Sequence, residues 1–208
     1  ALLRVFNDLI INADKNEINI LCLLDLSAAF DTIDHSIFHE RLRSVFGIDG
    51  TVLNWFASYL TGRDQRIVID DVSSASHTLK FGVPQGSVLG PVLFTMYMQP
   101  LAGVISRFGL QYHFYADDTQ IYSSAKSNEL PALVDTFEEC VLSVKGWMNE
   151  NRLKLNDDKS EALLAARKIM LQTVDIQCMH FGNSNIPFSP FVKNLGVYID
   201  SDLSMTKQ

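Results

Sequence analysis

The chain has 208 residues, of which 47% are hydrophobic and 10% aromatic, so it can build a core and lacks the composition of a disordered protein. No run of about 18 apolar residues escapes polar interruption, so no membrane span is predicted, and no secretory signal is visible. The net charge of −7 opposes nucleic-acid binding, so such a partner would require bound cations or basic surfaces outside this sequence.

The cysteines and the chain ends suggest the setting of the protein. Cys22, Cys140 and Cys178 are odd in number and lack metal-ligand spacing, which predicts buried free thiols in a reducing intracellular compartment, nuclear or cytoplasmic. The sequence starts inside an apolar helical pattern and stops without a closing element, so we expect both ends to be truncated. No linker or repeat divides residues 1–208, which are expected to form one domain.

The first elements are a helix and a central strand. Residues 1–13 carry a helical stripe of apolar side chains. Residues 18–26 (INILCLLDL) form an apolar run of strand length. This run contains Asp25, whose charge is unfavourable for the stability of a buried strand. Asp34 is placed to cap the next helix, and a short helix over residues 52–60 follows.

The middle of the chain is predicted to alternate short strands, a loop and a buried helix. Residues 66–70 and 78–81 have strand composition around a polar turn. Arg63 and Arg66 could contact phosphate or a template on the basis of charge alone, and a solvated edge strand explains them equally well. The loop PQGSVLG, residues 84–90, leads into a helix so apolar that it must be buried on most sides.

The remaining elements complete a sheet. Residues 111–124 are predicted to form a hairpin with Asp117 and Asp118 at its tip, and a clean helical stripe follows over residues 133–148. A strand over residues 161–166, a hairpin and one more strand end the chain. The predicted class is α+β, a mainly antiparallel sheet with helices on one face and a split β-α-β-β-α-β core.

Three carboxylates are the candidate chemistry of this sheet. Asp117 and Asp118 alone could simply close a turn. Asp25, however, ends a strand that neighbours the hairpin in such a sheet, so the three acids are expected to meet. A cluster of this kind suits Mg²⁺, and two such ions can activate a 3′-hydroxyl and stabilise a pyrophosphate leaving group. The alternative is three unrelated surface acids.

Five segments in this order closely resemble the palm motifs of reverse transcriptases, most of all those of non-LTR (LINE-type) retrotransposons: LLDLSAAFDTIDH, GVPQGSVLGPVLF, FYADDTQIY, LKLNDDKSE and KNLGVYID. They cover the chain from about residue 20 to about residue 200. The resemblance implies a palm domain of an RNA-directed DNA polymerase, with an RNA template, a DNA primer and deoxynucleoside triphosphates as partners and no membrane.

The resemblance also implies roles for individual residues. Asp25 and Asp117 would bridge two Mg²⁺ ions, for which Mn²⁺ could substitute, and Asp118 would be a third, less directly engaged acid. The backbone carbonyl of Leu26 would be a further metal ligand. Lys159 matches a lysine that protonates the departing pyrophosphate, a general-acid role, although a solvated lysine is the simpler interpretation.

Other matches concern the nucleotide and the primer. Phe30 matches the aromatic steric gate that excludes a ribose 2′-OH, although it could equally be a core aromatic. Gln85 and Gly86 match the loop that touches the incoming nucleotide and the template, where glycine permits close backbone approach. The segment that resembles the primer grip comprises Leu195, Gly196 and Val197.

The sequence departs from the family pattern at both ends. Only part of the fingers is expected, as an insert around residues 50–82, while the preceding basic finger motifs and the thumb are missing. Their absence offers an explanation of the acidic balance. Two alternatives to an active polymerase stay open: a catalytically inactive retrotransposon-derived fragment that is at most a binding surface, and a template-independent two-metal phosphotransferase or nuclease.

Overall fold

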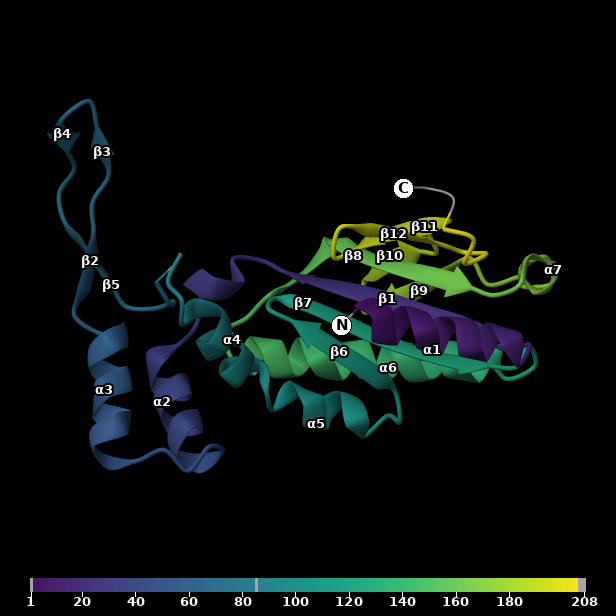
Figure 1. Ribbon diagram of the computed structural model, residues 1–208, viewed down its shortest axis with the longest axis horizontal. Coiled ribbons are helices and arrows are strands. Elements are labelled where there is room, and N and C mark those ends of the chain that lie inside the picture. The colour runs from purple at the N-terminus through teal and green to yellow at the C-terminus, as the bar shows by residue number, and fades with distance from the viewer. Residues whose placement is uncertain (1, 85, 206–208) are drawn as a thin grey trace.

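The computed structural model describes residues 2–84 and 86–205 (Figure 1). The helices are α1 (Leu2–Asp14), α2 (His35–Ser44), α3 (Gly50–Leu60), α4 (Gly90–Met98), α5 (Leu101–Ser106), α6 (Leu130–Glu150) and α7 (Lys168–Leu171), with a 3₁₀ turn, η1, over Ala29–Asp31. The first six strands are β1 (Ile18–Leu26), β2 (Arg63–Gln65), β3 (Val68–Ile69), β4 (Val72–Ser73), β5 (His77–Leu79) and β6 (Gln111–Tyr115). The others are β7 (Asp118–Ala125), β8 (Leu155–Ala165), β9 (Cys178–Phe181), β10 (Ser184–Pro187), β11 (Phe191–Asn194) and β12 (Val197–Asp200).

A four-stranded antiparallel sheet in the order β6-β7-β1-β8 is the centre of the molecule. Strand β1 lies between β7 and β8 and is buried over almost its whole length, which explains its continuous apolar sequence. The predicted α+β class is therefore confirmed, and so is the pairing of the first strand with the hairpin.

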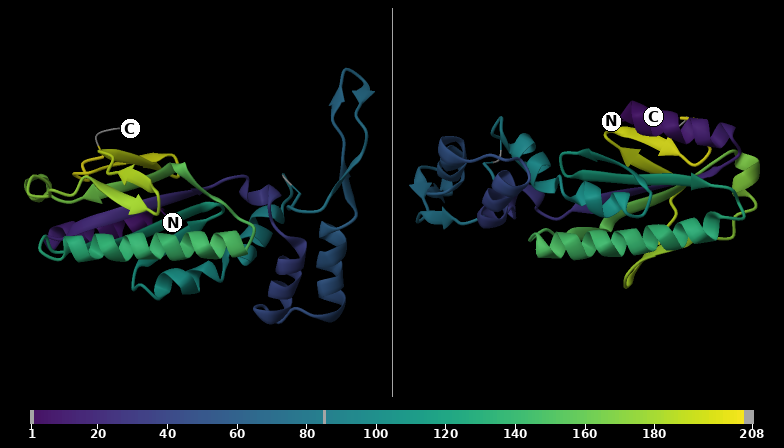
Figure 2. Two further views of the ribbon diagram at one scale, coloured as in Figure 1. Left: turned by 180° about the vertical axis from the view of Figure 1, so that it is seen from behind. Right: turned by 90° about the horizontal axis from the view of Figure 1, so that it is seen from below.

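One face of the sheet is covered by α6 together with α4 and α5 (Figure 2). Helix α6 buries one stripe of side chains at helical spacing, which accounts for the periodicity of its sequence. These buried residues are Leu130, Val134, Phe137, Cys140, Val141, Val144 and Met148. The stripe packs into a core cluster with Cys22 and Ile121 of the sheet.

The opposite face is covered by α1 and the β11–β12 hairpin, which lie across the sheet from α6 (Figure 2). Val5 and Leu9 of α1 share a buried cluster with Tyr122 of β7 and Val192 of β11. The expectation of helices on one face therefore holds for α4 to α6, whereas α1 packs on the other face. The amphipathic stripe of a helix does not indicate which face of a sheet it will cover.

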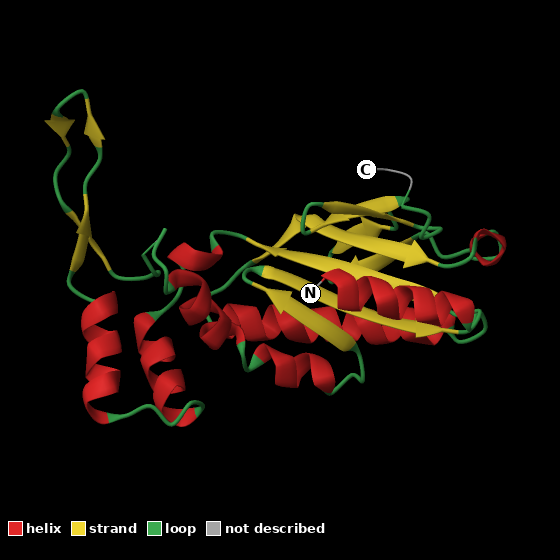
Figure 3. Cartoon of the chain, viewed as in Figure 1, coloured by secondary structure: helices red, strands yellow, loops and turns green. Residues whose placement is uncertain are grey.

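Helices α2 and α3 and a long two-stranded arm project beside the central sheet (Figure 3). The arm consists of the β2–β5 and β3–β4 pairs. It differs from the predicted strands 66–70 and 78–81, because Asp70 and Asp71 both have positive φ and make a tight turn between β3 and β4.

Arg41 joins the outer helix α2 to the rest of the molecule. Its guanidinium is buried, donates to the Tyr97 carbonyl and to Asn151 Oδ1, and lies over the Tyr97 and Trp147 rings. Burial lowers the pKa of this guanidinium, which the nearby Tyr97 raises only in part. This buried arginine therefore ties α2 to α4 and to the C-terminal end of α6.

Other expectations need small corrections. The helices α5 and α7 were not predicted, and the last predicted strand is half of a second hairpin, β11–β12. The three cysteines are free, with Cys22 and Cys140 buried and Cys178 partly exposed. Among the described residues, none of the helices combines the length and hydropathy that crossing a bilayer requires.

Candidate active site

Asp25 and Asp118 lie side by side on the central sheet. The β1–β7 ladder pairs Leu24 with Thr119, so Asp25 and Asp118 are the next residues on two adjacent strands. Side chains alternate along a strand, which places both carboxylates on the same face of the sheet. The predicted meeting of the first strand with the hairpin therefore brings these two acids together.

Asp117 occupies the turn itself. Tyr115 pairs with Asp118, which leaves Ala116 and Asp117 as the two connecting residues, and Ala116 adopts a left-handed conformation with φ of 53°. An alanine there is uncommon and costs about 1–2 kcal/mol relative to ordinary backbone. The hairpin thus turns abruptly at the point where it carries its two acids.

The acids influence one another electrostatically. The pKa of Asp118 is raised, first by loss of hydration around its carboxylate and then by the charges of Asp117 and Asp25. The Asp118 side chain is exposed to solvent, so a cation from solution could bind there and offset the repulsion among the three carboxylates.

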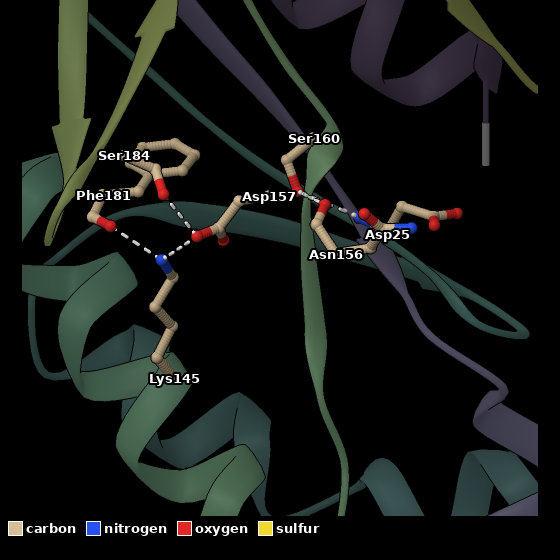
Figure 4. A network of polar contacts seen from close by, with 7 residues as sticks. All are labelled: Asp25, Lys145, Asn156, Asp157, Ser160, Phe181 and Ser184. Atoms are coloured by element: carbon tan, nitrogen blue, oxygen red, sulfur yellow. Dashed lines mark hydrogen bonds and ion pairs between the residues drawn. The ribbon is translucent and has the colours of Figure 1, made fainter.

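Lys159 reaches the same place through an irregularity in β8. Asp25 pairs with Asn156 and Leu23 with Glu161, so four residues of β8, 157–160, lie opposite the single residue Leu24. Such a bulge re-aims side chains that a regular strand would direct elsewhere. The backbone N–H of Asp25 donates to Ser160 Oγ over 3.4 Å, and Ser160 Oγ donates to the Asn156 carbonyl over 2.8 Å (Figure 4).

The bulge is anchored from the α6 side. Lys145 Nζ donates to Asp157 Oδ2 and to the Phe181 carbonyl, each at 2.7 Å, and Ser184 Oγ donates to the same Asp157 oxygen at 2.7 Å (Figure 4). Burial alone would raise the pKa of Asp157, but the Lys145 and Ser184 hydrogen bonds and the lysine charge outweigh it, so that the pKa is lowered. Asp157 therefore holds the bulge to α6 and β10 as a carboxylate.

A pocket of about 330 Å³ brings some of the predicted site residues together. It is lined by five of the expected polar and turn positions and by neighbours that sequence reasoning missed. The expected ones are Asp25, Asp118, Lys159, Leu195 and Gly196, and the missed polar ones are Thr119, Gln120, Glu161, Lys193 and Asn194. Carboxylates, two lysines and a backbone turn thus share one cavity.

The β11–β12 turn is attached to the catalytic hairpin by a reciprocal amide pair. Gln120 Nε2 donates to Asn194 Oδ1 at 2.8 Å, and Asn194 Nδ2 donates to Gln120 Oε1 at 3.1 Å. Both side chains are buried, with 1% and 2% exposure. The pair holds the turn Leu195–Gly196, whose two residues both have positive φ, against β7. No periodic sequence signal pointed to these two residues.

The other predicted site residues lie around rather than in this pocket. Phe30 is half-buried in η1, with its ring 4.8 Å from the Phe94 ring, and Gly86 has φ of 74° with no described atom where a Cβ would meet it. Leu26 is buried at the end of β1, and Val197 begins β12 opposite Asn194. Gln85 lies outside the described residues. The described pocket residues do not include Asp117, Phe30 or Gly86.

The donor set fits a hard divalent cation that is completed by its substrate. Among residues 2–84 and 86–205, no group of three or more His, Cys, Asp or Glu side chains could hold a metal ion by itself. Mg²⁺ seldom uses such a cage, and typically binds one or two carboxylates together with substrate phosphates and water. Asp25 and Asp118, adjacent on one face with a raised pKa at Asp118, offer that kind of site.

An antiparallel sheet with paired acids on adjacent strands and a lysine on the neighbouring strand is the arrangement expected of a polymerase-type domain. Comparison with known proteins identifies which one. Residues 4–199 match the family model described as reverse transcriptase (RNA-dependent DNA polymerase), and the chain belongs to this family.

Relatives of known description agree. The chain is 25% identical over 209 residues to the RNA-directed DNA polymerase from mobile element jockey of Drosophila funebris, covering 98% of this chain and 22% of that protein. It is 24% identical over 208 residues to the probable RNA-directed DNA polymerase from transposon X-element of Drosophila melanogaster, with the same coverages. The chain thus spans about a fifth of the length of these relatives, and its resemblance to reverse transcriptase domains of non-LTR (LINE-type) retrotransposons is confirmed.

Solved structures show the same fold. Apo telomerase from Candida tropicalis, truncated from its C-terminal domain, superposes with a TM-score of 0.65 at 12% identity, over 99% of this chain and 39% of that one. Telomerase from Candida tropicalis in complex with a fragment of telomeric RNA gives a TM-score of 0.64 at 11% identity, over 99% of this chain and 33% of that one. These similarities establish the palm-like fold.

Proposed function

We propose that the chain is the palm of an RNA-directed DNA polymerase, which adds deoxynucleotides to the 3′-hydroxyl of a DNA primer on an RNA template. The observation that carries the proposal is the shared pocket, in which Asp25, Asp118 and Lys159 meet the Leu195–Gly196 turn. Membership in the reverse transcriptase family supports the same reaction.

The family resemblance gives the bridging role to Asp25 and Asp117. In the sheet it is Asp118 that lies beside Asp25 and lines the pocket with it, so we propose that Asp25 and Asp118 would hold Mg²⁺, with Asp117 and the Leu26 carbonyl as further ligands. When bound, two such ions supply Lewis acidity and neutralise charge on the triphosphate. Asp25 and Asp118 present their carboxylates from adjacent strands, so the sheet fixes the distance between them. A fixed distance between the ligands would hold the ion, and the substrate bound to it, in one reactive position.

The reaction follows from these positions. The primer 3′-oxygen attacks the α-phosphorus of the incoming nucleotide and loses its proton to water, while the bond between the α-phosphorus and the bridging oxygen breaks. Lys159 donates a proton to the departing pyrophosphate, which lowers the charge on the leaving group. Lys159 lines the same pocket as the carboxylates, and the backbone N–H of Asp25 is tied to the β8 bulge through Ser160.

The surrounding residues would position the substrates. The Leu195–Gly196 turn and Val197 would support the primer terminus. The hydrogen bonds between Gln120 and Asn194 would hold this turn in place next to the acids. Phe30 would exclude a ribose 2′-OH, and its contact with Phe94 would keep the ring in place. Gln85 and Gly86 would touch the nucleotide and the template. The open space beside Gly86 would leave room for these two ligands.

The domain assignment is part of the proposal. Residues 1–208 form a partial reverse transcriptase domain, a palm with a fingers insert around residues 50–82. That insert corresponds to α3 and the two-stranded arm. Regions of a longer protein would supply the basic surfaces that the net charge of −7 lacks.

The test is incorporation of a labelled deoxynucleotide into a DNA primer annealed to RNA, with Mg²⁺. Asp25→Asn and Asp118→Asn should abolish incorporation. Asp158→Asn is the matched control, because this exposed acid of the same bulge does not belong to the described lining of the pocket. Equal incorporation by all four proteins would contradict the proposal. Primer–template binding without incorporation by the unaltered chain would support the alternative of an inactive, retrotransposon-derived binding surface.

A further inference from the structure

The turn that carries Phe30 is held by a segment from a distant part of the sequence. Residues 80–83, here called the strap, lead from the end of β5 toward the loop before α4. The Val83 N–H donates to the Phe30 carbonyl at 2.9 Å, and the Gly82 N–H donates to the Ile33 carbonyl at 2.8 Å. The strap therefore fixes η1 at its centre and again just beyond its end.

The strap also lies directly against the backbone of η1. A Cβ on Gly82 would lie 2.9 Å from the Asp31 Cα and 3.0 Å from the Phe30 carbonyl oxygen, so only glycine permits this approach. The turn begins after Ala28, which has left-handed backbone with φ of 51°. Such a conformation persists only where the surrounding structure enforces it. The contacts of the strap thus hold a turn whose own backbone geometry is unfavourable.

His35 holds the strap from its other side. His35 Nε2 donates to the Gly82 carbonyl at 2.8 Å. This carbonyl belongs to the same peptide unit as the Val83 N–H, which donates to the Phe30 carbonyl. Because a peptide unit is planar and rigid, its two polar groups move together, and a hydrogen bond to one group strengthens the bond made by the other. His35 is therefore linked to the backbone of Phe30 through one rigid peptide.

The position of His35 is itself well defined. It is the first residue of α2, and the Asp34 side chain caps this helix by accepting from the Ser36 and Ile37 N–H groups at 2.9 and 3.0 Å. A capped helix end is a firm base for the histidine ring. The hydrogen bond to the strap thus starts from a fixed point.

The ring of Phe30 is supported separately from its backbone. It lies 4.8 Å from the ring of Phe94, which is completely buried in α4. Phe30 itself is only half-buried. The strap therefore fixes the backbone and Phe94 supports the ring, while the remaining surface of Phe30 is free to meet a ligand.

We propose that His35 is a positioning residue for sugar selectivity, which acts through the Gly82–Val83 peptide to hold Phe30 where a ribose 2′-OH would collide with its ring. The inference rests on the proposed function, in which Phe30 excludes this hydroxyl. Apolar surfaces reject a substrate that merely adds a hydroxyl only weakly, so exclusion requires a ring that does not retreat. Without the His35 N–H, the peptide and the Phe30 carbonyl bound to it gain freedom, and the ring yields to the hydroxyl.

The test measures nucleotide binding without chemistry. The chain is bound to an RNA template and a DNA primer that ends in a dideoxynucleotide, with Mg²⁺, and its affinities for a deoxynucleoside triphosphate and for the matching ribonucleoside triphosphate are compared. The unaltered chain should bind the ribonucleotide more weakly. His35→Phe, which keeps a ring but lacks the N–H, should lower this selectivity about tenfold, mainly through tighter binding of the ribonucleotide.

Matched variants separate the hydrogen bond from packing. His35→Gln keeps an N–H donor on a long side chain and should retain most of the selectivity, whereas His35→Ala should show the same loss as His35→Phe. His39→Phe is the control, because His39 lies one turn further along α2 and makes no hydrogen bond to the strap among the described residues. It should leave the selectivity unchanged.

A double variant shows whether His35 acts through Phe30. Once Phe30→Ala has removed the ring, adding His35→Phe should not change the selectivity further. An equal loss with and without the Phe30 ring would overturn the proposal. So would the selectivity of the unaltered chain persisting in both His35→Phe and His35→Ala.

The outcomes also separate this inference from the proposed function. Selectivity in binding that depends on His35, without incorporation onto an extendable primer, would contradict only the polymerase proposal. Incorporation with a selectivity that is independent of His35 would contradict only the role of this histidine. Failure of the unaltered chain to bind either triphosphate would contradict both.

Discussion

Replacing Asn194 with leucine removes half of the reciprocal amide pair that joins β11 to β7. Gln120 would then remain in a site where it is 1% exposed, with the two hydrogen bonds of 2.8 and 3.1 Å lost. A buried polar group without partners costs about 1–3 kcal/mol. We therefore expect Asn194→Leu, and likewise Gln120→Leu, to lower the free energy of unfolding by about 2 kcal/mol each.

The double variant separates hydrogen bonding from packing. With both amides replaced by leucine, no polar group stays unsatisfied, so the total loss should be only about 0–1 kcal/mol. The coupling between the two sites is then about 3 kcal/mol, at the upper end of what contacting residues show. Each single variant should melt about 4–8 °C below the unaltered chain, since about 1 kcal/mol corresponds to 2–4 °C at this size.

Urea unfolding of the four proteins measures this cycle directly. Lys193→Ala is the control, because the side chain of this exposed neighbour on β11 makes no hydrogen bond to β7 among the described residues. Its free energy of unfolding should stay within about 0.5 kcal/mol of that of the unaltered chain. Additive losses from the two single variants would refute the reasoning, because independent contributions would mean that the amides do not act as a pair.

Two further changes test the neighbouring segments. The pKa of Asp157 is lowered from an ordinary 3.8, so the stability that its pair with Lys145 adds is present above that value and is lost as pH falls through the lower folded pKa. Asp157→Asn should therefore cost about 1.5–3 kcal/mol near pH 7 and flatten the acid side of a melting-temperature profile; an unchanged profile would contradict this. Gly82→Ala, whose Cβ would lie 2.9 Å from the Asp31 Cα at a φ of +82°, should destabilise the chain by at least about 1–2 kcal/mol. Gly103→Ala in α5, where no described atom lies within 4 Å, should be neutral or stabilising in the same thermal melts.

The sequence was most informative where one physical rule dominates. The apolar run of β1 and the helical stripe of α6 follow from burial on both faces and on one face respectively, and both elements were predicted. Asp25 stood out because a charge inside such a run opposes stability. The juxtaposition of Asp25 with Asp118 followed from the sheet order.

The features that the sequence did not indicate depend on long-range contacts. The strand was predicted to begin at Glu161, but β8 begins at Leu155 because its bulge is held by Lys145 and Ser184. No local sequence pattern predicts a four-residue bulge that side chains distant in the sequence stabilise. The Gln120–Asn194 pair is of the same kind, since polar residues on strands ordinarily indicate a solvent-facing side.

The account depends most directly on Asp25 and Asp118 binding one divalent cation between adjacent strands. Titrating Mg²⁺ while following the melting temperature tests this at the site itself, because a ligand of the folded state alone raises stability with concentration. We expect Mg²⁺ to raise the melting temperature of the unaltered chain and of Asp158→Asn, and to have no such effect on Asp25→Asn or Asp118→Asn. The same Mg²⁺-dependent rise in all four proteins would contradict the account.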